Sequence, residues 1–284
     1  MRFTPGDDFD PARITDSGQC FRWKMLSEDT CRLIHAGRCL YAVRTGIDEF
    51  ELDCSEEEFS SIWSGYFDLE EDYAAIRGRI DPVKDPFLAK ACAEGKGIRI
   101  LRQDPFEALI SFIISQNRNI PAIRNSIELL CRMAGEERTD KRGEPFYTFP
   151  GPESIASLPD ERLAACRLGY RAGYVRAAAV AAAKGTFDPD ALEKKSDEEA
   201  MTELTKLYGV GVKVAGCMLL FGLHRLNAFP VDVWIRRAIG TEYPAGYPME
   251  EYAPYNGVYQ QYMFAYYRNG KTKHRTCSGG TDHV

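Results

Sequence analysis

The segment LYGVGVKVAGC, residues 207–217, places two glycines two positions apart, shortly before a lysine and an apolar run. A G-x-G turn that enters a helix exposes backbone N–H groups at the helix N-terminus, where they can hold a phosphate. A dinucleotide site would need a preceding β-strand and a third glycine, but the preceding residues have a helical pattern and position 214 is Val. The segment therefore predicts a helix, a tight hairpin and a second helix, over about 196–223, that hold a DNA phosphate without reading sequence.

The composition is that of an ordinary globular chain. With 284 residues, 44% of them hydrophobic, it suits one large domain or two to three small ones. The longest apolar run, VAGCMLLFGL, is too short to cross a bilayer, and the polar, acidic N-terminus does not resemble a signal peptide. We therefore expect a cytoplasmic monomer with reduced thiols and no membrane partner.

Cysteine and histidine spacing argues against several classes of site. The nine cysteines include no C-x-x-C pair, and the four histidines show no H-E-x-x-H or similar spacing. A disulfide framework, a zinc ribbon, an iron–sulfur cluster and metal-dependent hydrolysis therefore have little support. The net charge of −6 does not exclude nucleic acid, because phosphate binding depends on where the cations lie and not on their sum.

Hydrophobic periodicity divides the chain into a β region and a longer helical region. Residues 1–85 hold short alternating runs such as CFRWKML, CRLIHAG and CLYAVRT, which predict an antiparallel sheet. Within residues 86–270, three- and four-residue apolar spacings predict helices over 105–116, 119–134, 160–167, 171–184, 196–206, 212–223, 231–240 and 256–268. We expect the polar tail, 271–284, to be loose. The predicted fold class is α+β and mostly α: an N-terminal antiparallel β domain followed by two helical subdomains that meet at a cleft.

Five motifs, in order along nearly the whole chain, resemble those of 8-oxoguanine DNA glycosylases in the helix-hairpin-helix (HhH-GPD) superfamily. They are SGQCFRW (17–23), SFIISQNRNI (111–120), LGYRAGYV (168–175), LYGVGVKVAGC followed by FPVDVWIRRAIG (207–217, 229–240), and NGVYQQYMFAYYR (256–268). Cys217, one helical turn after Lys213, is the feature similar to the 8-oxoguanine enzymes within that superfamily.

The resemblance implies a bifunctional DNA glycosylase and AP lyase of base excision repair. Its partner would be double-stranded DNA containing 8-oxoguanine, and it would need no organic cofactor. It would act at the nucleoid in a bacterium or in the nucleus of a eukaryote.

The implied chemistry assigns Lys213 as the nucleophile and Asp232 as its electrostatic partner. The damaged nucleotide must first be flipped out of the duplex. A lysine near a helix N-terminus in apolar surroundings has its ammonium form destabilised, which favours a neutral amine that attacks C1′ and forms a Schiff base. A carboxylate beside the sugar stabilises the positive charge of an oxocarbenium-like transition state. Asp232 also qualifies as the N-cap of the helix after Pro230.

The resemblance places four residues around the flipped base. The carbonyl of Gly18 would accept the proton that N7 carries in 8-oxoguanine but not in guanine. Gln260 would bond to the Watson–Crick edge, while Phe264 and Cys217 would cover the two faces of the ring. Plainer interpretations remain open: a strand turn at Gly18, a core cysteine, and a core helix with an aromatic stripe.

Other residues are implied to hold the DNA around the gap. Asn117 would fill the hole in the duplex, with Tyr170 as the wedge and Arg171 as the reader of the orphaned base. A solvated loop and a surface arginine are the plainer alternatives. The implied hairpin contacts are phosphate-binding N–H groups of Gly209, Gly211 and Val212, and a possible monovalent or other hard cation on the backbone carbonyls of Thr205, Leu207 and Val210.

Two positions depart from the family pattern. Ala122 stands five residues after Asn117, where members that require cytosine opposite the lesion carry an arginine, so we expect relaxed discrimination of the opposite base. Trp234 stands where many relatives have a histidine near the flipped nucleotide, which changes the phosphate contacts expected there.

Two other functions remain open from the sequence. An alkylated-purine glycosylase shares the fold but activates water through the aspartate alone, and Lys213 argues against it. A non-catalytic DNA-binding module would leave Lys213, Cys217 and Asp232 idle. Relatives of the endonuclease III type carry a C-terminal four-cysteine cluster, whereas only Cys277 lies near this C-terminus.

Overall fold

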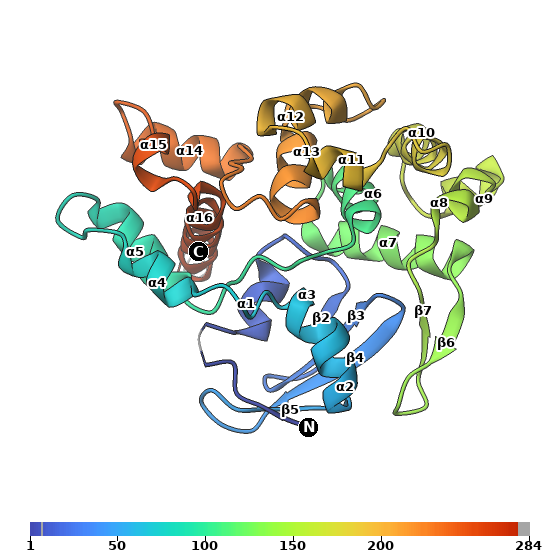
Figure 1. Cartoon of the computed structure of the whole chain (residues 1–284), viewed down its shortest axis with the longest axis horizontal. Coiled ribbons are helices and arrows are strands. Elements are labelled where there is room, and N and C mark those ends of the chain that lie inside the picture. The colour runs from blue at the N-terminus through green and yellow to red at the C-terminus, as the bar shows by residue number, and fades with distance from the viewer. Residues whose placement is uncertain (7, 278–284) are drawn as a thin grey trace, which may run out of the picture.

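A five-stranded antiparallel sheet forms the N-terminal part of the molecule, at the bottom of Figure 1. The computed structural model describes residues 1–6 and 8–277. The strands are β1 (Arg2–Phe3), β2 (Trp23–Met25), β3 (Thr30–His35), β4 (Arg38–Arg44) and β5 (Phe50–Leu52), in the order β1-β5-β4-β3-β2.

The hairpin of β3 and β4 shows how the register follows from the sequence. Its two-residue turn, Ala36 and Gly37, has φ of 48° and 67°, as a tight hairpin between twisted strands requires. This turn pairs Leu33 with Leu40, and both side chains are completely buried. They belong to a core that also contains Trp63, from the helical segment that follows the sheet.

The remaining elements are helices, together with one short hairpin. Those up to residue 94 are α1 (Pro11–Asp16), α2 (Glu56–Glu58), the π-helical turn η1 (Phe59–Trp63), α3 (Ser64–Tyr66), α4 (Tyr73–Gly78) and α5 (Pro86–Glu94). The middle ones are α6 (Pro105–Ser115), α7 (Ile120–Ala134), β6 (Glu137–Thr139), β7 (Pro145–Tyr147), α8 (Pro152–Ala156), α9 (Asp160–Ala165), α10 (Arg171–Ala183) and α11 (Pro189–Glu193). The last are α12 (Asp197–Thr205), α13 (Val212–Cys217), the π-helical turn η2 (Met218–Gly222), α14 (Val233–Glu242), α15 (Met249–Tyr252) and α16 (Asn256–Cys277).

The helices form two groups above the sheet. In one group, towards the right and top of Figure 1, α6 packs on α7, α10 and η2, and α12 packs on α13. In the other, on the left, α16 packs on α5 and α14. The second group therefore combines an early segment of the chain with its last helices, and one continuous core joins it to the first group.

The helix formed by α13 and η2 lies deep in this core. Every residue from Val214 to Leu223 is buried. Lys213 is the only charged side chain of the helix, and it lies in the first turn, where burial is incomplete. The apolar sequence thus fixes the helix in the core and leaves its lysine at the boundary.

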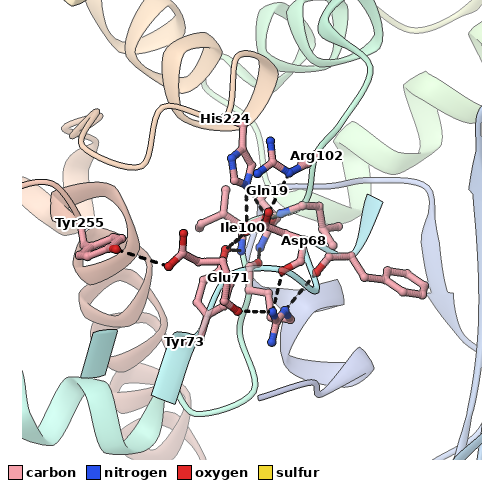
Figure 2. A network of polar contacts seen from close by, with 11 residues as sticks. Gln19, Asp68, Glu71, Tyr73, Ile100, Arg102, His224 and Tyr255 are labelled. Carbon is pink, nitrogen blue, oxygen red and sulfur yellow. Dashed lines mark hydrogen bonds and ion pairs between the residues drawn. The ribbon is translucent and has the colours of Figure 1, made fainter. Parts of the chain in front are cut away.

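A buried polar network joins the N-terminal part of the chain to the other end of this helix, as Figure 2 shows. Asp68, which is 1% exposed, accepts hydrogen bonds from Tyr73 Oη at 2.8 Å and Arg102 Nε at 2.7 Å. Its Oδ2 lies 3.1 Å from Nε2 of His224, just beyond η2, and the same nitrogen lies 3.1 Å from the carbonyl oxygen of Ile100. Both partners only accept, so Nε2 carries the hydrogen.

Arg99 fixes the irregular backbone beneath this network. It is 1% exposed and its guanidinium donates to four carbonyl oxygens, those of Asp8 (3.0 Å), Phe67 (3.0 Å), Asp68 (2.6 Å) and Glu71 (2.7 Å). These carbonyl groups are not paired within a helix or strand, and one side chain supplies their hydrogen bonds instead.

The predicted fold class is confirmed. The three predicted strand segments correspond to β2, β3 and β4, and every predicted helix is present. The eight cysteines up to Cys217 are free and buried, as expected for reduced core thiols. Among the described residues, no helix has the length and apolar character needed to cross a membrane.

Some boundaries differ from the prediction. The helix expected over 256–268 continues to Cys277, so the first part of the tail expected to be loose is helical; residues 278–284 lie outside the described residues. The helix expected from 231 begins at Val233, because Asp232 caps it. The short helices α1 to α5, α8, α11 and α15 and the hairpin of β6 and β7 were not predicted, since segments of three to nine residues carry little periodic signal.

We predict that Asp68→Asn destabilises the fold in a pH-dependent way. Burial raises the pKa of Asp68, but the hydrogen bond and charge of His224, the Tyr73 hydroxyl and the charge of Arg102 outweigh it and hold the pKa below its usual value. A depressed carboxyl pKa contributes stability above the unfolded pKa, and this contribution is lost as the pH falls through the folded pKa. Asparagine also tolerates the positive φ of 54° at this position.

Urea unfolding at several pH values tests this prediction. We expect a loss of about 2 kcal/mol at pH 7, and a difference from the wild type that shrinks below about pH 4. Asp48→Asn, at an exposed turn, is the control and should change little. A difference that stays constant from pH 7 to pH 3 would contradict the role of the carboxylate.

Candidate active site

A cavity of about 660 Å³ lies between the two helical groups. It is lined from the turn after α1, the loop between α6 and α7, α13, the N-terminus of α14, and α16. Eight of the predicted site residues line it: Gly18, Asn117, Gly211, Lys213, Cys217, Asp232, Gln260 and Phe264. Trp234 lines it as well, whereas Ala122, Tyr170, Arg171, Thr205, Leu207, Gly209, Val210 and Val212 lie outside its lining.

Lys213 reaches the cavity from the first turn of α13. Its Nζ lies 3.5 Å from Oγ of Ser115 and 5.4 Å from the centre of the Phe112 ring. The amine therefore contacts a hydroxyl and an aromatic face, as well as the thiol of Cys217, and has no carboxylate partner among the described salt bridges. The neutral amine that the sequence suggests stays a prediction.

Cys217 lies one turn further along the same helix and is 3% exposed. Burial raises the pKa of its thiol, and the charge of Lys213 and a hydrogen bond to Lys213 only partly offset this effect. The thiol is therefore protonated at neutral pH. It presents a soft, uncharged surface to the cavity and is not a competing nucleophile.

Asp232 is the N-cap of α14. Its Oδ1 accepts from the backbone N–H groups of Trp234 and Ile235, both at 2.9 Å. This arrangement confirms the predicted capping role and fixes the carboxylate at the cavity wall. Within the described residues, Oδ2 has no hydrogen-bond partner, so it remains free to face a developing positive charge.

Gly18 has φ of 76°, a conformation that favours glycine. A Cβ atom there would lie 3.5 Å from the Phe264 ring and 3.6 Å from Ile120, in ordinary contact. The backbone conformation, and not lack of space, thus selects glycine at this position. Gly18 and the Phe264 ring are neighbours in the cavity wall, although residues 18 and 264 lie at opposite ends of the chain.

Gln260 is 3% exposed and its amide is held at both ends. Nε2 donates to the carbonyl oxygen of Pro230 at 3.0 Å, and Oε1 accepts from Nε2 of Gln261 at 3.0 Å. The amide orientation is therefore fixed by its neighbours before any base arrives.

Asn117 and Tyr170 lie next to each other, as their predicted joint role requires. Asn117 adopts φ of 51° at the exposed tip of the loop after α6, a conformation that asparagine tolerates better than most residues. Its Nδ2 donates to Tyr170 Oη at 3.3 Å, and Tyr170 is 56% exposed. Two separate loops thus present a polar and an aromatic tip side by side.

Arg171 is 6% exposed and differs from the surface arginine that the sequence allowed. Its Nε donates to the carbonyl oxygen of Gln116 at 2.7 Å and its Nη1 to that of Leu168 at 3.2 Å. Gln116 also donates from Nε2 to the carbonyl oxygen of Gly209 at 3.0 Å. In this structure Arg171 supports the Asn117 loop, and reading an orphaned base would require it to give up these bonds.

The hairpin before α13 is tightly packed on one side and exposed on the other. Gly209 has φ of 85°, and a Cβ there would lie 2.1 Å from the Tyr174 ring, so only glycine fits. Gly211 caps α13, and Val212 is 72% exposed in its first turn. The exposed backbone N–H groups at this point match the predicted phosphate contact.

Of the three carbonyls predicted to hold a cation, that of Leu207 already accepts the N–H of Val210 at 3.0 Å. A carbonyl oxygen has a second lone pair, so this bond is compatible with a cation ligand. Among the described residues, no cluster of three or more His, Cys, Asp or Glu side chains offers an alternative metal site.

The cavity wall also contains residues that the sequence did not identify as functional. Among those with polar or charged side chains are Ser115, Arg118, Arg236, Gln261 and Arg268. The three arginines place positive charge around the cavity, although the net charge of the protein is −6. Each of the five residues lies inside one of the quoted motifs, and this position was the one indication of a functional role. Nothing else in the sequence distinguished these residues from ordinary surface or core residues.

The match to known families covers most of the chain. Residues 3–109 match the model of the 8-oxoguanine DNA glycosylase N-terminal domain, and residues 110–245 match that of the HhH-GPD superfamily base excision DNA repair proteins. The solved structure of a Clostridium acetobutylicum 8-oxoguanine glycosylase/lyase, in complex with DNA that has cytosine opposite 8-oxoguanine, superimposes with a TM-score of 0.86 at 34% identity. The match covers 93% of each chain.

Two curated relatives are similar over shorter stretches. The N-glycosylase/DNA lyase of Saccharomyces cerevisiae is 30% identical over 82% of this chain and 68% of its own length. A probable N-glycosylase/DNA lyase of Methanothermobacter thermautotrophicus is 33% identical over 66% of this chain and 64% of its own length, just under two thirds. The chain belongs to the 8-oxoguanine DNA glycosylase family, within the HhH-GPD superfamily of base excision DNA repair proteins.

Proposed function

We propose that the chain is a bifunctional DNA glycosylase and AP lyase that excises 8-oxoguanine from double-stranded DNA. The observation that carries this proposal is the meeting of Lys213 and Asp232 in one cavity of about 660 Å³, whose size suits a flipped base. The relatives named glycosylase/lyase support it. The enzyme would act wherever its genome lies, at the nucleoid of a bacterium or in a nucleus.

DNA binding precedes the chemistry. The hairpin N–H groups at Gly211 and Val212 hold a backbone phosphate without reading sequence. Arg118, Arg236 and Arg268 add positive charge around the cavity. The flipped nucleotide leaves a gap, which Asn117 fills while Tyr170 wedges between the neighbouring bases.

The Lys213 amine then attacks C1′ of the flipped nucleotide. The C1′–N9 bond breaks and the base leaves with the electron pair, while the carboxylate of Asp232 stabilises the positive charge that develops on the sugar. Loss of the amine protons and opening of the sugar ring give a Schiff base. Removal of a C2′ proton then breaks the C3′–O bond and cleaves the strand.

Recognition of the lesion uses both edges of the base. The carbonyl of Gly18 accepts the N7 proton of 8-oxoguanine, which guanine lacks. Phe264, beside Gly18, covers one face of the ring, and the uncharged thiol of Cys217 covers the other. Gln260 faces the Watson–Crick edge. Arg171 is kept as a candidate reader of the opposite base, since opening its bonds to backbone carbonyls would free the guanidinium.

No organic cofactor enters this scheme. A monovalent or other hard cation on the carbonyls of Thr205, Leu207 and Val210 would neutralise the phosphate held by the same hairpin.

Lys213 distinguishes this proposal from its rivals. A glycosylase for alkylated purines that activates water through Asp232 has no use for an amine at this position, and a DNA-binding module has no use for the cavity.

Lys213→Gln tests the proposal. We expect base release and strand cleavage to fall by about a thousandfold or more, because glutamine keeps much of the length but is no nucleophile. Both products are measured under single turnover with an 8-oxoguanine duplex. Lys90→Gln, at an exposed position on α5 outside the cavity, is the matched control and should act like the wild type. Substantial base release by Lys213→Gln would refute the nucleophile assignment.

Ala122→Arg tests the expected tolerance for the opposite base. Ala122 lies in the first turn of α7, just after the Asn117 loop. We expect the wild type to excise 8-oxoguanine opposite cytosine and adenine at similar rates, and the variant to favour cytosine by about tenfold, because a guanidinium can bond the orphaned base. Ala122→Met controls for side-chain size. A wild-type preference for cytosine that is already about a hundredfold, and unchanged by arginine, would count against this expectation.

A further inference from the structure

Gln261, next to the base-binding candidate Gln260, has a buried acceptor that the fold leaves unused. The residue is 3% exposed and lines the cavity. Its Nε2 donates to Oε1 of Gln260 at 3.0 Å, whereas its own Oε1 is buried and, within the described residues, has no hydrogen-bond partner. An unsatisfied buried oxygen of this kind is rare in folded proteins, and each one calls for an explanation.

Pro230, Gln260 and Gln261 form a row of hydrogen bonds whose direction is set by the Pro230 carbonyl. The carbonyl of Pro230 can only accept, so the amide of Gln260 must turn its Nε2 to it. Oε1 of Gln260 then faces Gln261, which must donate to it from its own Nε2. Turning either amide over would bring two oxygens or two N–H groups together. This row of hydrogen bonds therefore ends in an oxygen, Oε1 of Gln261, and the carbonyl of Pro230 fixes its polarity.

Two hydrogen-bond acceptors thus belong to neighbouring residues that line the cavity. One is the second lone pair of Gln260 Oε1, and the other is Oε1 of Gln261. The Watson–Crick edge of a guanine-type base has two adjacent donors, N1–H and the exocyclic 2-amino group. An adenine-type base has an acceptor at N1 and no group at C2 to donate.

We propose that Gln261 is a specificity-determining residue that accepts a hydrogen bond from the exocyclic 2-amino group of the flipped base. This inference rests on the proposed function and deepens it. Gln260 takes N1–H, and the neighbouring Gln261 takes the amino group while holding the Gln260 amide in the accepting orientation. The pair selects oxidised guanine over oxidised purines that lack a 2-amino group.

The test compares 8-oxoguanine with 8-oxohypoxanthine, which keeps N1–H and the 8-oxo group but lacks the 2-amino group. Both are placed opposite cytosine, and base release is measured under single turnover. We expect the wild type to favour 8-oxoguanine by about tenfold or more, since the analogue leaves the Gln261 acceptor buried without a partner.

Gln261→Met, of similar length and without polar atoms, should slow release of 8-oxoguanine by about tenfold and leave 8-oxohypoxanthine within about threefold of its wild-type rate. Gln261→Leu is a second apolar variant, in case methionine packs poorly. Thermal unfolding checks that each variant is folded. Affinity for a duplex with a tetrahydrofuran abasic analogue, which has no base to contact, should remain unchanged in both.

The outcomes separate the inference from the proposed function. Equal rates for the two bases in the wild type, or equal slowing of both by Gln261→Met, would overturn the contact to the amino group while leaving the glycosylase assignment intact. Failure of the wild type to release 8-oxoguanine at all would overturn the proposed function and this inference together.

Discussion

The site depends on the burial of the helix that carries Lys213. From Val214 to Leu223 this helix is apolar and enclosed by the core, so it cannot rotate or slide without exposing that surface. Its far end is held by His224, which bonds to Asp68 and to the carbonyl of Ile100. With the helix enclosed by the core and its far end held, its one charged side chain reaches the cavity at a defined position.

The groups around Lys213 are likewise held before substrate arrives. Asp232 is fixed by the backbone of α14, and the amide of Gln260 by Pro230 and Gln261. Catalytic groups that are ordered in advance cost less reorganisation during the reaction. The exposed tips of Asn117 and Tyr170, in contrast, have room to move into DNA.

Local patterns predicted much of this structure. The strand alternation, the helical periodicity and the hairpin before Lys213 each involve near neighbours in sequence, and the motif order located Gly18, Asp232 and Phe264. Contacts between distant residues could not be predicted this way. The bond between Asp68 and His224, the burial of Arg171 under the Asn117 loop and the unused oxygen of Gln261 all arise from packing between separate segments, which leaves no periodic trace in either one.

Borohydride trapping tests the central claim, that Lys213 is the amine that attacks the sugar. The wild-type protein is incubated with an 8-oxoguanine duplex, the Schiff base is reduced, and the DNA-linked peptide is identified by mass spectrometry. The structure predicts one covalent adduct, on Lys213, and none with an undamaged or a 3-methyladenine duplex. An adduct on another amine, or tight binding of the lesion with base release and no adduct, would contradict the account.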